Sequence, residues 1–222
     1  MMCLRHPRAA GHRGLCAACL LEAAFAHAPT AASQPEGSFT IQMPLGHSPA
    51  SSVFLVKRDG VAGRLLRLKT WNKAPPRAFL ARFERLQRQL TDWGNETIPA
   101  PLAAWVDSSG HPSVLTEFNQ GVPVFERLES GALDPMEAES CLMELRAVTR
   151  TAHGRGLVHG SIVGGNIIVG GRCRAARLLD FGHAALVAPD GDAAPEAAAD
   201  IRDFDRLIHT VRAFSSVRPS RL

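Results

Sequence analysis

Short apolar stretches alternate with turn-forming residues through the first half of the chain, from residue 39 to residue 118. Stretches of this length and pattern are typical of β-strands. We predict strands at residues 39–41, 53–56, 65–68, 102–105 and 113–118. Residues 77–93 instead carry apolar side chains at helical spacing, with arginines on the opposite face. The pattern therefore predicts an antiparallel meander that is interrupted by one helix.

The second half of the chain has a mainly helical pattern. A helix of about twenty residues is expected to begin near Asp134 and Pro135, and an apolar helix is expected at 199–214. Two short strands are expected between these helices, around 167–169 and 177–179. A β-rich half followed by a helical half predicts an α+β fold with two lobes.

The composition is that of a globular protein. The chain has 222 residues, of which 45% are hydrophobic and 21% are charged, and these values exclude a wholly disordered chain. The formal net charge of +4 comes mostly from arginines that are scattered along the chain, so a nucleic-acid partner is not expected. No segment has the roughly 18 uninterrupted apolar residues of a membrane span. We therefore expect a soluble, cytoplasmic protein.

The N-terminal segment contains residues that commonly bind zinc. Two candidate ligand pairs, each with two intervening residues, are Cys3 with His6 and Cys16 with Cys19. This spacing lets both side chains of a tight knuckle reach one tetrahedral Zn²⁺, so a Cys₃His site is predicted, with His12 as a competing ligand. Two alternatives remain open: free thiols on a flexible terminus, and a secretory leader whose apolar part is 15–28.

Five motifs follow one another in a fixed order between residues 39 and 214. They are LRLK at 66–69, HGSIVGGN at 159–166, LLDFG at 178–182, APE at 194–196 and DIRDF at 200–204. In this order they resemble the motifs of the bacterial Ser/Thr protein kinase family. The resemblance implies a two-lobed protein-kinase-like fold and a role in signalling. The cysteine segment also resembles one that precedes some bacterial kinases of this type, which favours the zinc interpretation.

The resemblance implies a division of the chain into five parts. They are a zinc-knuckle segment at 1–28, a linker at 29–37, a kinase-like N-lobe at 38–120, a shortened C-lobe at 121–216 and a tail at 217–222. The linker is also indicated by its composition, which is rich in proline and small polar residues.

The resemblance further implies a site for Mg-ATP. The residues that it places there are Lys69 and Gly46 at the phosphates, Asn166 and Asp180 at Mg²⁺, and Thr116, Glu117 and Phe118 at adenine. His159 and Ser161 lie in the motif that carries the catalytic base of the family, and Ser161 stands at the position of the base itself.

Several positions depart from the family pattern where phosphoryl transfer needs its chemistry. They are Ser161 for the catalytic Asp, Val163 for a Lys, Leu86 for the Glu that clamps the strand Lys, and Arg67 for the Ala that packs on adenine. The phosphate-binding loop keeps one glycine, Gly46, and contains Pro49, which has no N–H to donate. A serine hydroxyl is far too weak a base at neutral pH. Catalysis and ATP binding are both expected to be weak or absent.

Three functions are consistent with these residues. The first is a pseudokinase that acts as a signalling scaffold or regulator, with weak or no ATP binding. The second is an active or feeble Ser/Thr kinase, and the third is a truncated gene product without function. The chain ends at Leu222, soon after the helix expected at 199–214, so we expect this helix to be uncovered and to bind a protein partner or a second copy of the chain.

Overall fold

The structure of the protein is a computed structural model. It describes residues 11–12, 15–16, 39–58, 65–170, 176–190 and 195–217. The chain divides into two compact units. The sheet unit contains the described residues up to Leu80 together with Pro101–Phe118, and the helical unit contains Ala81–Ala100 and the described residues from Asn119 onward. Each unit is described by itself below.

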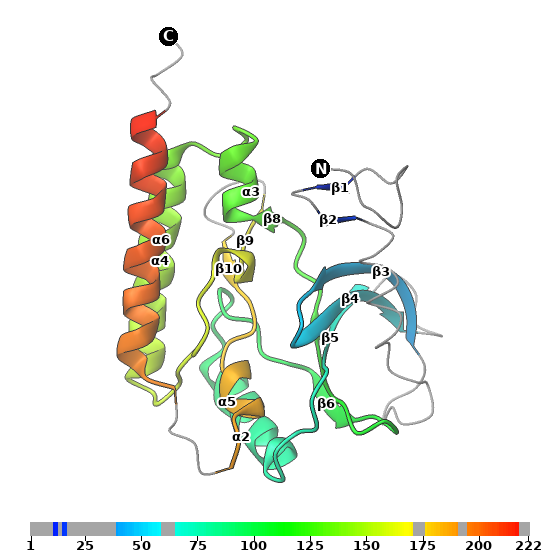
Figure 1. The fold of residues 1–222 in the computed structure, drawn as a ribbon. Coiled ribbons are helices and arrows are strands. Elements are labelled where there is room, and N and C mark those ends of the chain that lie inside the picture. The colour runs from blue at the N-terminus through cyan, green and yellow to red at the C-terminus, as the bar shows by residue number, and fades with distance from the viewer. Residues whose placement is uncertain are drawn as a thin grey trace. The chain divides into compact units, whose positions relative to one another are not determined.

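Five antiparallel strands form one sheet in the sheet unit, in the order β3-β4-β5-β7-β6 (Figure 1). Their bounds are β3 Phe39–His47, β4 Ser51–Arg58, β5 Leu65–Trp71, β6 Ala103–Val106 and β7 Pro112–Glu117. Every strand predicted for this half of the chain is present. The strand β3 is longer than the predicted 39–41, because two register shifts on either side of Pro44 allow it to continue along β4 as an edge strand.

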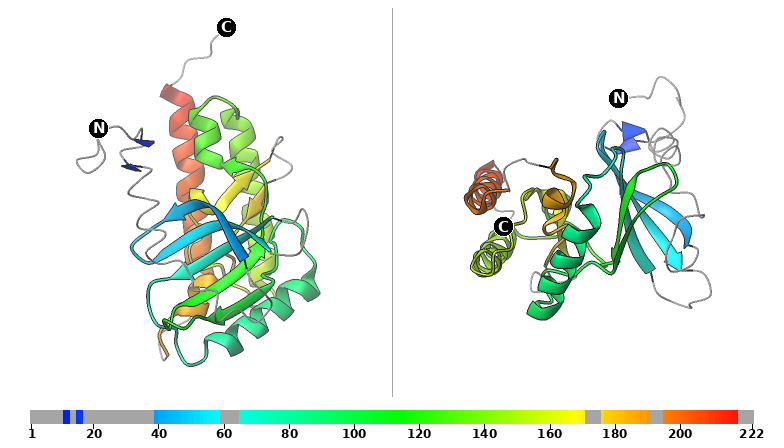
Figure 2. Two further views of the ribbon diagram at one scale, coloured as in Figure 1. Left: turned by 90° about the vertical axis from the view of Figure 1, so that its right-hand side faces the viewer. Right: turned by 90° about the horizontal axis from the view of Figure 1, so that it is seen from below.

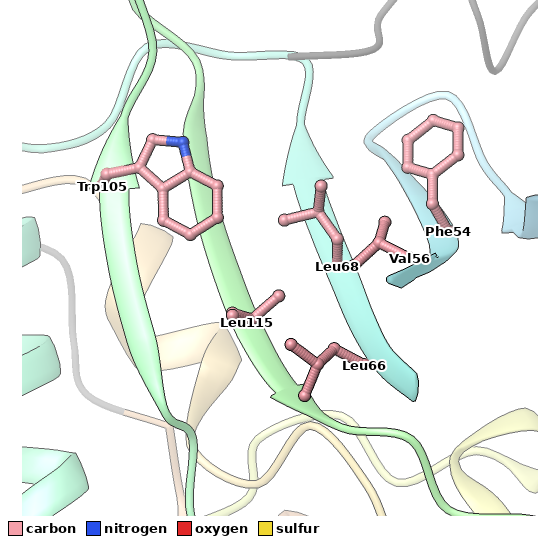
Figure 3. Close-up of a cluster of buried hydrophobic side chains, with 6 residues drawn as sticks. All are labelled: Phe54, Val56, Leu66, Leu68, Trp105 and Leu115. Atoms are coloured by element: carbon pink, nitrogen blue, oxygen red, sulfur yellow. The ribbon is translucent and has the colours of Figure 1, made fainter. Parts of the chain in front are cut away.

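The core of the sheet unit lies on one face of this sheet. Buried side chains from four strands meet there, as Figure 3 shows: Phe54, Val56, Leu66, Leu68, Trp105 and Leu115. Phe39 extends this layer, since its ring stacks on Trp105 with the ring centroids 6.3 Å apart. Side chains alternate between the two faces of a strand, so Arg67 and Lys69 of β5 point to the face opposite this core.

Helices dominate the helical unit. Their bounds are α2 Phe79–Trp93, which begins in the sheet unit, α3 Val124–Glu129, α4 Pro135–His153, α5 His183–Val187 and α6 Ala197–Val217. A small antiparallel sheet has the order β10-β9-β8, from strands Arg177–Leu178, Ile167–Val169 and Val122–Pro123, and a 3₁₀ turn, η2, covers Gly164–Asn166. The predicted elements of this half are present, whereas β8, α3 and α5 were missed because two to six residues show no readable periodicity.

The helices α4 and α6 lie side by side and antiparallel (Figures 1 and 2). The helix α4 begins where the sequence predicted, because the Asp134 side chain accepts the Met136 amide and Glu137 closes a capping box. On α6, Ile208 and Val211 are buried, whereas Leu207 and Phe214 are half-buried.

The predicted zinc ligands lie outside what the structure describes. Cys3, His6 and Cys19 are not among the described residues, and of Cys16 only the backbone is described. That backbone belongs to a short antiparallel pair of strands, β1 Gly11–His12 and β2 Leu15–Cys16. Among the described helices, none is both long and apolar enough to cross a membrane.

Candidate functional site

Arg67 and Lys69 lie on the face of the sheet unit that is opposite the core. They are the alternate residues of β5, and their neighbours are set by strand register. Arg67 pairs with Leu55 on β4 and Thr116 on β7, and Lys69 pairs with Val53 and Val114. This face therefore carries two cationic residues, two positions apart, whose neighbours in register are apolar except for Thr116.

Arg67 is largely buried, with 9% of its surface exposed. The Thr116 hydroxyl donates to the Arg67 carbonyl at 3.4 Å, so these two residues are joined through the backbone of β5 as well as by register. A guanidinium on a long aliphatic stem keeps its charge at any physiological pH and occupies far more space than a methyl group. A flat apolar ligand therefore finds a bulky cation at this point of the face.

The Lys69 side chain interacts with an aromatic residue of its own strand. Its Nζ atom lies 5.1 Å from the centroid of the Trp71 ring, within the range of a cation–π contact. Trp71 in turn packs edge-on against Phe79, with the ring centroids 6.5 Å apart. Lys69 is thus directed along the strand by packing within the sheet unit.

The backbone amides of the hairpin between β3 and β4 donate hydrogen bonds within the hairpin itself. The Ser48 hydroxyl accepts from the amides of Ala50, at 3.3 Å, and Ser51, at 3.0 Å, and the Ser48 amide donates to the Ser51 carbonyl at 2.8 Å. Pro49 has no amide hydrogen. The amides of residues 48, 50 and 51 therefore already donate hydrogen bonds, and residue 49 has no amide hydrogen. A phosphate could bind these amides only by displacing the existing hydrogen bonds.

Gly46 does not mark a close approach in this hairpin. It pairs with Val53 near the end of β3, and a Cβ atom added to it would meet nothing within 4 Å. Of the residues expected at adenine, Thr116 is buried, Glu117 is exposed and Phe118 donates its amide to the Leu65 carbonyl at 3.3 Å. Thr116 and Glu117 are the last two residues of β7, which pairs with β5, and Phe118 follows directly after them.

In the helical unit, His159 is held by hydrogen bonds on both ring nitrogens. Its Nε2 lies 2.9 Å from the Leu179 carbonyl oxygen, which can only accept, and its Nδ1 lies 3.2 Å from the Ser161 amide, which can only donate. These partners select the neutral tautomer with the proton on Nε2. His159 is completely buried and its ring stands edge-on to Phe181. Its role in this arrangement is structural, and neither nitrogen is available to take a substrate proton.

Asp200 at the start of α6 organises the same segment. Its buried carboxylate accepts the amides of His159 and Gly160, both at 2.8 Å, and it contacts Nε2 of His153 at 2.9 Å. Gly160 has a φ of +80°, and an added Cβ would lie 2.9 Å from Ala184 and Pro195. The sequence indicated Asp200 only as part of the DIRDF motif, and nothing in that motif reports which amides it binds.

Asn166 closes the segment that begins at His159. Its side-chain amide nitrogen donates to the Ser161 carbonyl at 3.1 Å, and its backbone carbonyl accepts the Leu179 amide at 2.8 Å. The structure therefore brings Asn166 beside the strand that leads into Asp180. The side-chain nitrogen of Asn166 faces the Ser161 carbonyl. The side-chain oxygen of Asn166 therefore points away from Ser161, and it can act as an acceptor.

Asp180 has a strained backbone. With a φ of 62°, it is the one non-glycine residue with positive φ among the residues that the structure describes. Its Oδ1 lies 3.3 Å from Nδ1 of His183, and both side chains are almost fully buried. Strain of this kind persists only where the surrounding structure holds it, and it clusters at functional sites.

The side chains that the segment 159–166 presents to solvent are chemically weak. Ser161 is exposed, and Val163 is 50% exposed. A hydroxyl cannot act as a general base at neutral pH, and an isopropyl group cannot neutralise an anion. Within the described ranges no group of three or more His, Cys, Asp or Glu residues is arranged to hold a metal ion.

A comparison with curated proteins identifies a kinase relative. Residues of this chain are 28% identical over 159 positions to Serine/threonine-protein kinase pkn2 of Myxococcus xanthus. The alignment covers 70% of this chain but 19% of that protein, so the chain spans about a fifth of the relative's length. No protein-family profile matches the chain. The similarity supports a kinase-like relationship at family level, and the mixed α+β structure with its antiparallel sheet is consistent with a kinase-like N-lobe.

Proposed function

We propose that the chain is a pseudokinase: a kinase-like domain that acts as a signalling scaffold or regulator, with weak or no ATP binding. The observation that carries this proposal is a contrast within one segment. The hydrogen bonds that fix the backbone around His159 and Asn166 are all made, yet the exposed positions hold Ser161 and Val163. We expect a binding module of this kind to keep the hydrogen bonds that fix the backbone and to lack side chains that can accept a proton or neutralise a phosphate.

The residues fit Mg-ATP only in part. The Asp180 carboxylate and the side-chain oxygen of Asn166 are ligands of the type that Mg²⁺ prefers. The hairpin at 48–51 does not fit a phosphate, because Ser48 already occupies its amides. The sheet face at Arg67 does not fit an adenine ring. We therefore propose no phosphoryl-transfer step for this chain.

The proposal is tested by thermal unfolding in the presence of ATP, with and without Mg²⁺. A ligand that binds only the folded state raises the midpoint in proportion to RT ln(1 + [L]/Kd). We expect little or no shift for the wild type at millimolar ATP, and a larger Mg²⁺-dependent shift for Arg67→Ala, which replaces the guanidinium with a methyl group. Arg58→Ala, on the neighbouring strand β4, is the matched control for loss of one positive charge.

A feeble Ser/Thr kinase is the second candidate, and the strained Asp180 favours it. Strain at an acidic residue costs stability and would be retained most readily if the carboxylate still had a ligand. This candidate predicts a Mg²⁺-dependent midpoint shift in the wild type that Lys69→Ala and Asp180→Ala each abolish. Transfer of labelled phosphate to a Ser/Thr substrate, lost in the same two variants, would replace the pseudokinase proposal with this one.

We also propose that Cys3, His6, Cys16 and Cys19 bind one Zn²⁺ in an N-terminal knuckle. The support is the spacing of the four residues. The metal content of the purified protein tests it: we expect about one equivalent of zinc in the wild type, by the stoichiometry of a Cys₃His site, and a marked loss in Cys16→Ser. Well under one equivalent in the wild type, with no effect of Cys16→Ser, would remove the proposal.

A protein partner, or a second copy of the chain, is proposed to cover the half-buried apolar residues Leu207 and Phe214 of α6. The support is that Leu207 and Phe214 remain half-buried while Ile208 and Val211 are buried. Light scattering after size exclusion distinguishes the two occupants, because self-association depends on protein concentration. We expect Leu207→Asp to abolish association without unfolding the chain, and a monomer at all concentrations would leave only the separate partner.

A further inference from the structure

The helix α2 contacts α5 at both of its ends, through two residues that lie one turn apart. At the start of α5, Gly182 packs so closely against Leu86 that an added Cβ would lie 2.7 Å from a Leu86 methyl carbon. At the end of α5, the Arg82 guanidinium donates to the carbonyls of Ala185, at 3.1 Å, and Ala188, at 2.5 Å. The spacing of Arg82 and Leu86 by four residues places both on one side of α2.

Asp190 completes the contact at the C-terminal end. Its carboxylate accepts from the second terminal nitrogen of Arg82 at 3.0 Å, so one guanidinium binds two carbonyls and one carboxylate. The planar fork of arginine can make such bonds simultaneously, whereas a lysine ammonium presents a single charged point. Cationic groups at a helix C-terminus also interact favourably with its unpaired carbonyls.

The helix α5 has little stability of its own. It is five residues long, its N-cap is Gly182 in a left-handed conformation, and no side chain caps its first turn. Isolated helices of this length do not form in water, because the cost of the first turn is not recovered. The conformation of residues 183–187 must therefore be fixed by contacts outside the helix, and the contacts from α2 meet it at each end.

We propose that Arg82 and Asp190 form a built-in latch that holds residues 183–190 against α2 and thereby positions Asp180. The link to Asp180 is short: the His183 amide donates to the Asp180 carbonyl at 3.1 Å, and the His183 ring contacts the Asp180 carboxylate. Arg82 is thus a positioning residue that acts through α5. The inference goes beyond the proposed function, because the latch consists of the chain's own residues and needs no nucleotide.

Hydrogen exchange of the backbone amides tests the latch in the intact chain without ligand. In Arg82→Gln we expect the amides of residues 184–188 to exchange about tenfold faster, as expected for loss of hydrogen bonds to a charged group, while the amides of α4 keep their protection. Asp190→Asn should accelerate the same amides by a smaller factor. Arg85→Gln removes an exposed arginine from the same helix and is the matched control, for which no local change is expected.

Two further readouts separate positioning from general stability. The double variant Arg82→Gln/Asp190→Asn should exchange no faster than Arg82→Gln alone, because both changes break the same contact. The imidazole resonances of His183 should shift in Arg82→Gln but not in Arg85→Gln, since they report the contact with Asp180. If Arg82→Gln fails to fold, Arg82→Lys keeps the charge and removes the fork, and the same local acceleration is expected.

Two results would overturn the latch. One is unchanged exchange at 184–188 in both Arg82→Gln and Asp190→Asn. The other is an acceleration that is equal in 184–188 and in α4, with His183 resonances unmoved, because Arg82 would then stabilise the unit as a whole. Neither result depends on ATP, so the latch and the pseudokinase proposal can fail separately.

Discussion

The buried carboxylate of Asp200 accepts the backbone amide of His159 at 2.8 Å, across 41 residues of sequence. The same carboxylate accepts the Gly160 amide, so both of its oxygens face donors. This pairing fixes the start of the segment that contains Ser161 and Asn166. Asp200 is fully buried, and no solvent is available to replace a lost acceptor.

Asp200→Asn is predicted to destabilise the fold. An amide group has one acceptor oxygen, so the substitution turns an NH₂ donor toward a backbone N–H donor and leaves that donor unsatisfied. The expected loss is about 1–3 kcal/mol in the free energy of unfolding, measured by urea denaturation. Asp205→Asn, at an exposed position of the same helix, is the control and should change the free energy by less than about 0.5 kcal/mol. Equal effects of the two variants would contradict the prediction.

Gly164→Ala is predicted to clash with Phe125. A Cβ atom at residue 164 would lie 2.3 Å from a ring carbon of Phe125, well inside van der Waals contact. Forcing such an overlap typically costs about 1–3 kcal/mol, and the variant should unfold at a lower urea concentration.

A double-mutant cycle checks the cause of this loss. Phe125→Leu removes the ring, so Gly164→Ala should cost much less in that background than in the wild type. Gly165→Ala is the matched control, because an added Cβ at residue 165 meets nothing within 4 Å. If Gly164→Ala costs the same with and without Phe125, the contact with the ring is not its cause.

The order of strands and helices could be predicted from the sequence, whereas most of the site's contacts could not. Apolar periodicity locates α2 and places Leu86 on its buried side and Glu84 on its exposed side, as the structure has them. Those features depend on residues a few positions apart. Periodicity says nothing about contacts such as Arg82 with Asp190, which join positions 108 residues apart.

Hydrogen bonds between residues close in sequence could not be predicted from the sequence pattern either. The scarcity of glycine and the presence of Pro49 predicted a poor phosphate loop, and the bonds that Ser48 makes to the amides of Ala50 and Ser51 are a second reason for the same expectation. Serine at this position has several rotamers, and composition does not select the one that binds the amides. The strain at Asp180 is likewise invisible in the motif LLDFG.

The Glu139–Arg212 pair predicts a pH dependence of stability. The hydrogen bond from Arg212 lowers the pKa of Glu139, and the same pair raises the pKa of Arg212. A carboxylate with a lowered pKa in the folded state contributes stability above its unfolded pKa of about 4.3, and the contribution is lost as the pH falls through the lower folded value. The difference in unfolding free energy between the wild type and Arg212→Gln should therefore be present at pH 7 and vanish toward pH 2.

The matched pair for this test is Arg146 with Asp205, which links the same two helices. Arg146→Gln reports the loss of a bridge between α4 and α6 that does not involve Glu139. Because the Arg212 side chain is exposed and Glu139 is half-buried, solvent ions can screen the pair, and high salt should reduce the effect at pH 7. A difference between the wild type and Arg212→Gln that stays constant from pH 7 to pH 2 would show that Glu139 is not the titrating group.

A carboxylate placed at residue 161 is not expected to give phosphoryl transfer. Ser161→Asp places an acidic group at an exposed position of an intact framework, so the variant should fold with an unchanged unfolding midpoint. Transfer also depends on holding and neutralising the phosphates, and on the proposed function the hairpin amides at 48–51 and Val163 supply neither. We expect no transfer of labelled phosphate above background from either Ser161→Asp or the wild type. Transfer by Ser161→Asp that disappears in Ser161→Asp/Lys69→Ala would mean that the base alone was missing, and that the rest of the site still binds ATP.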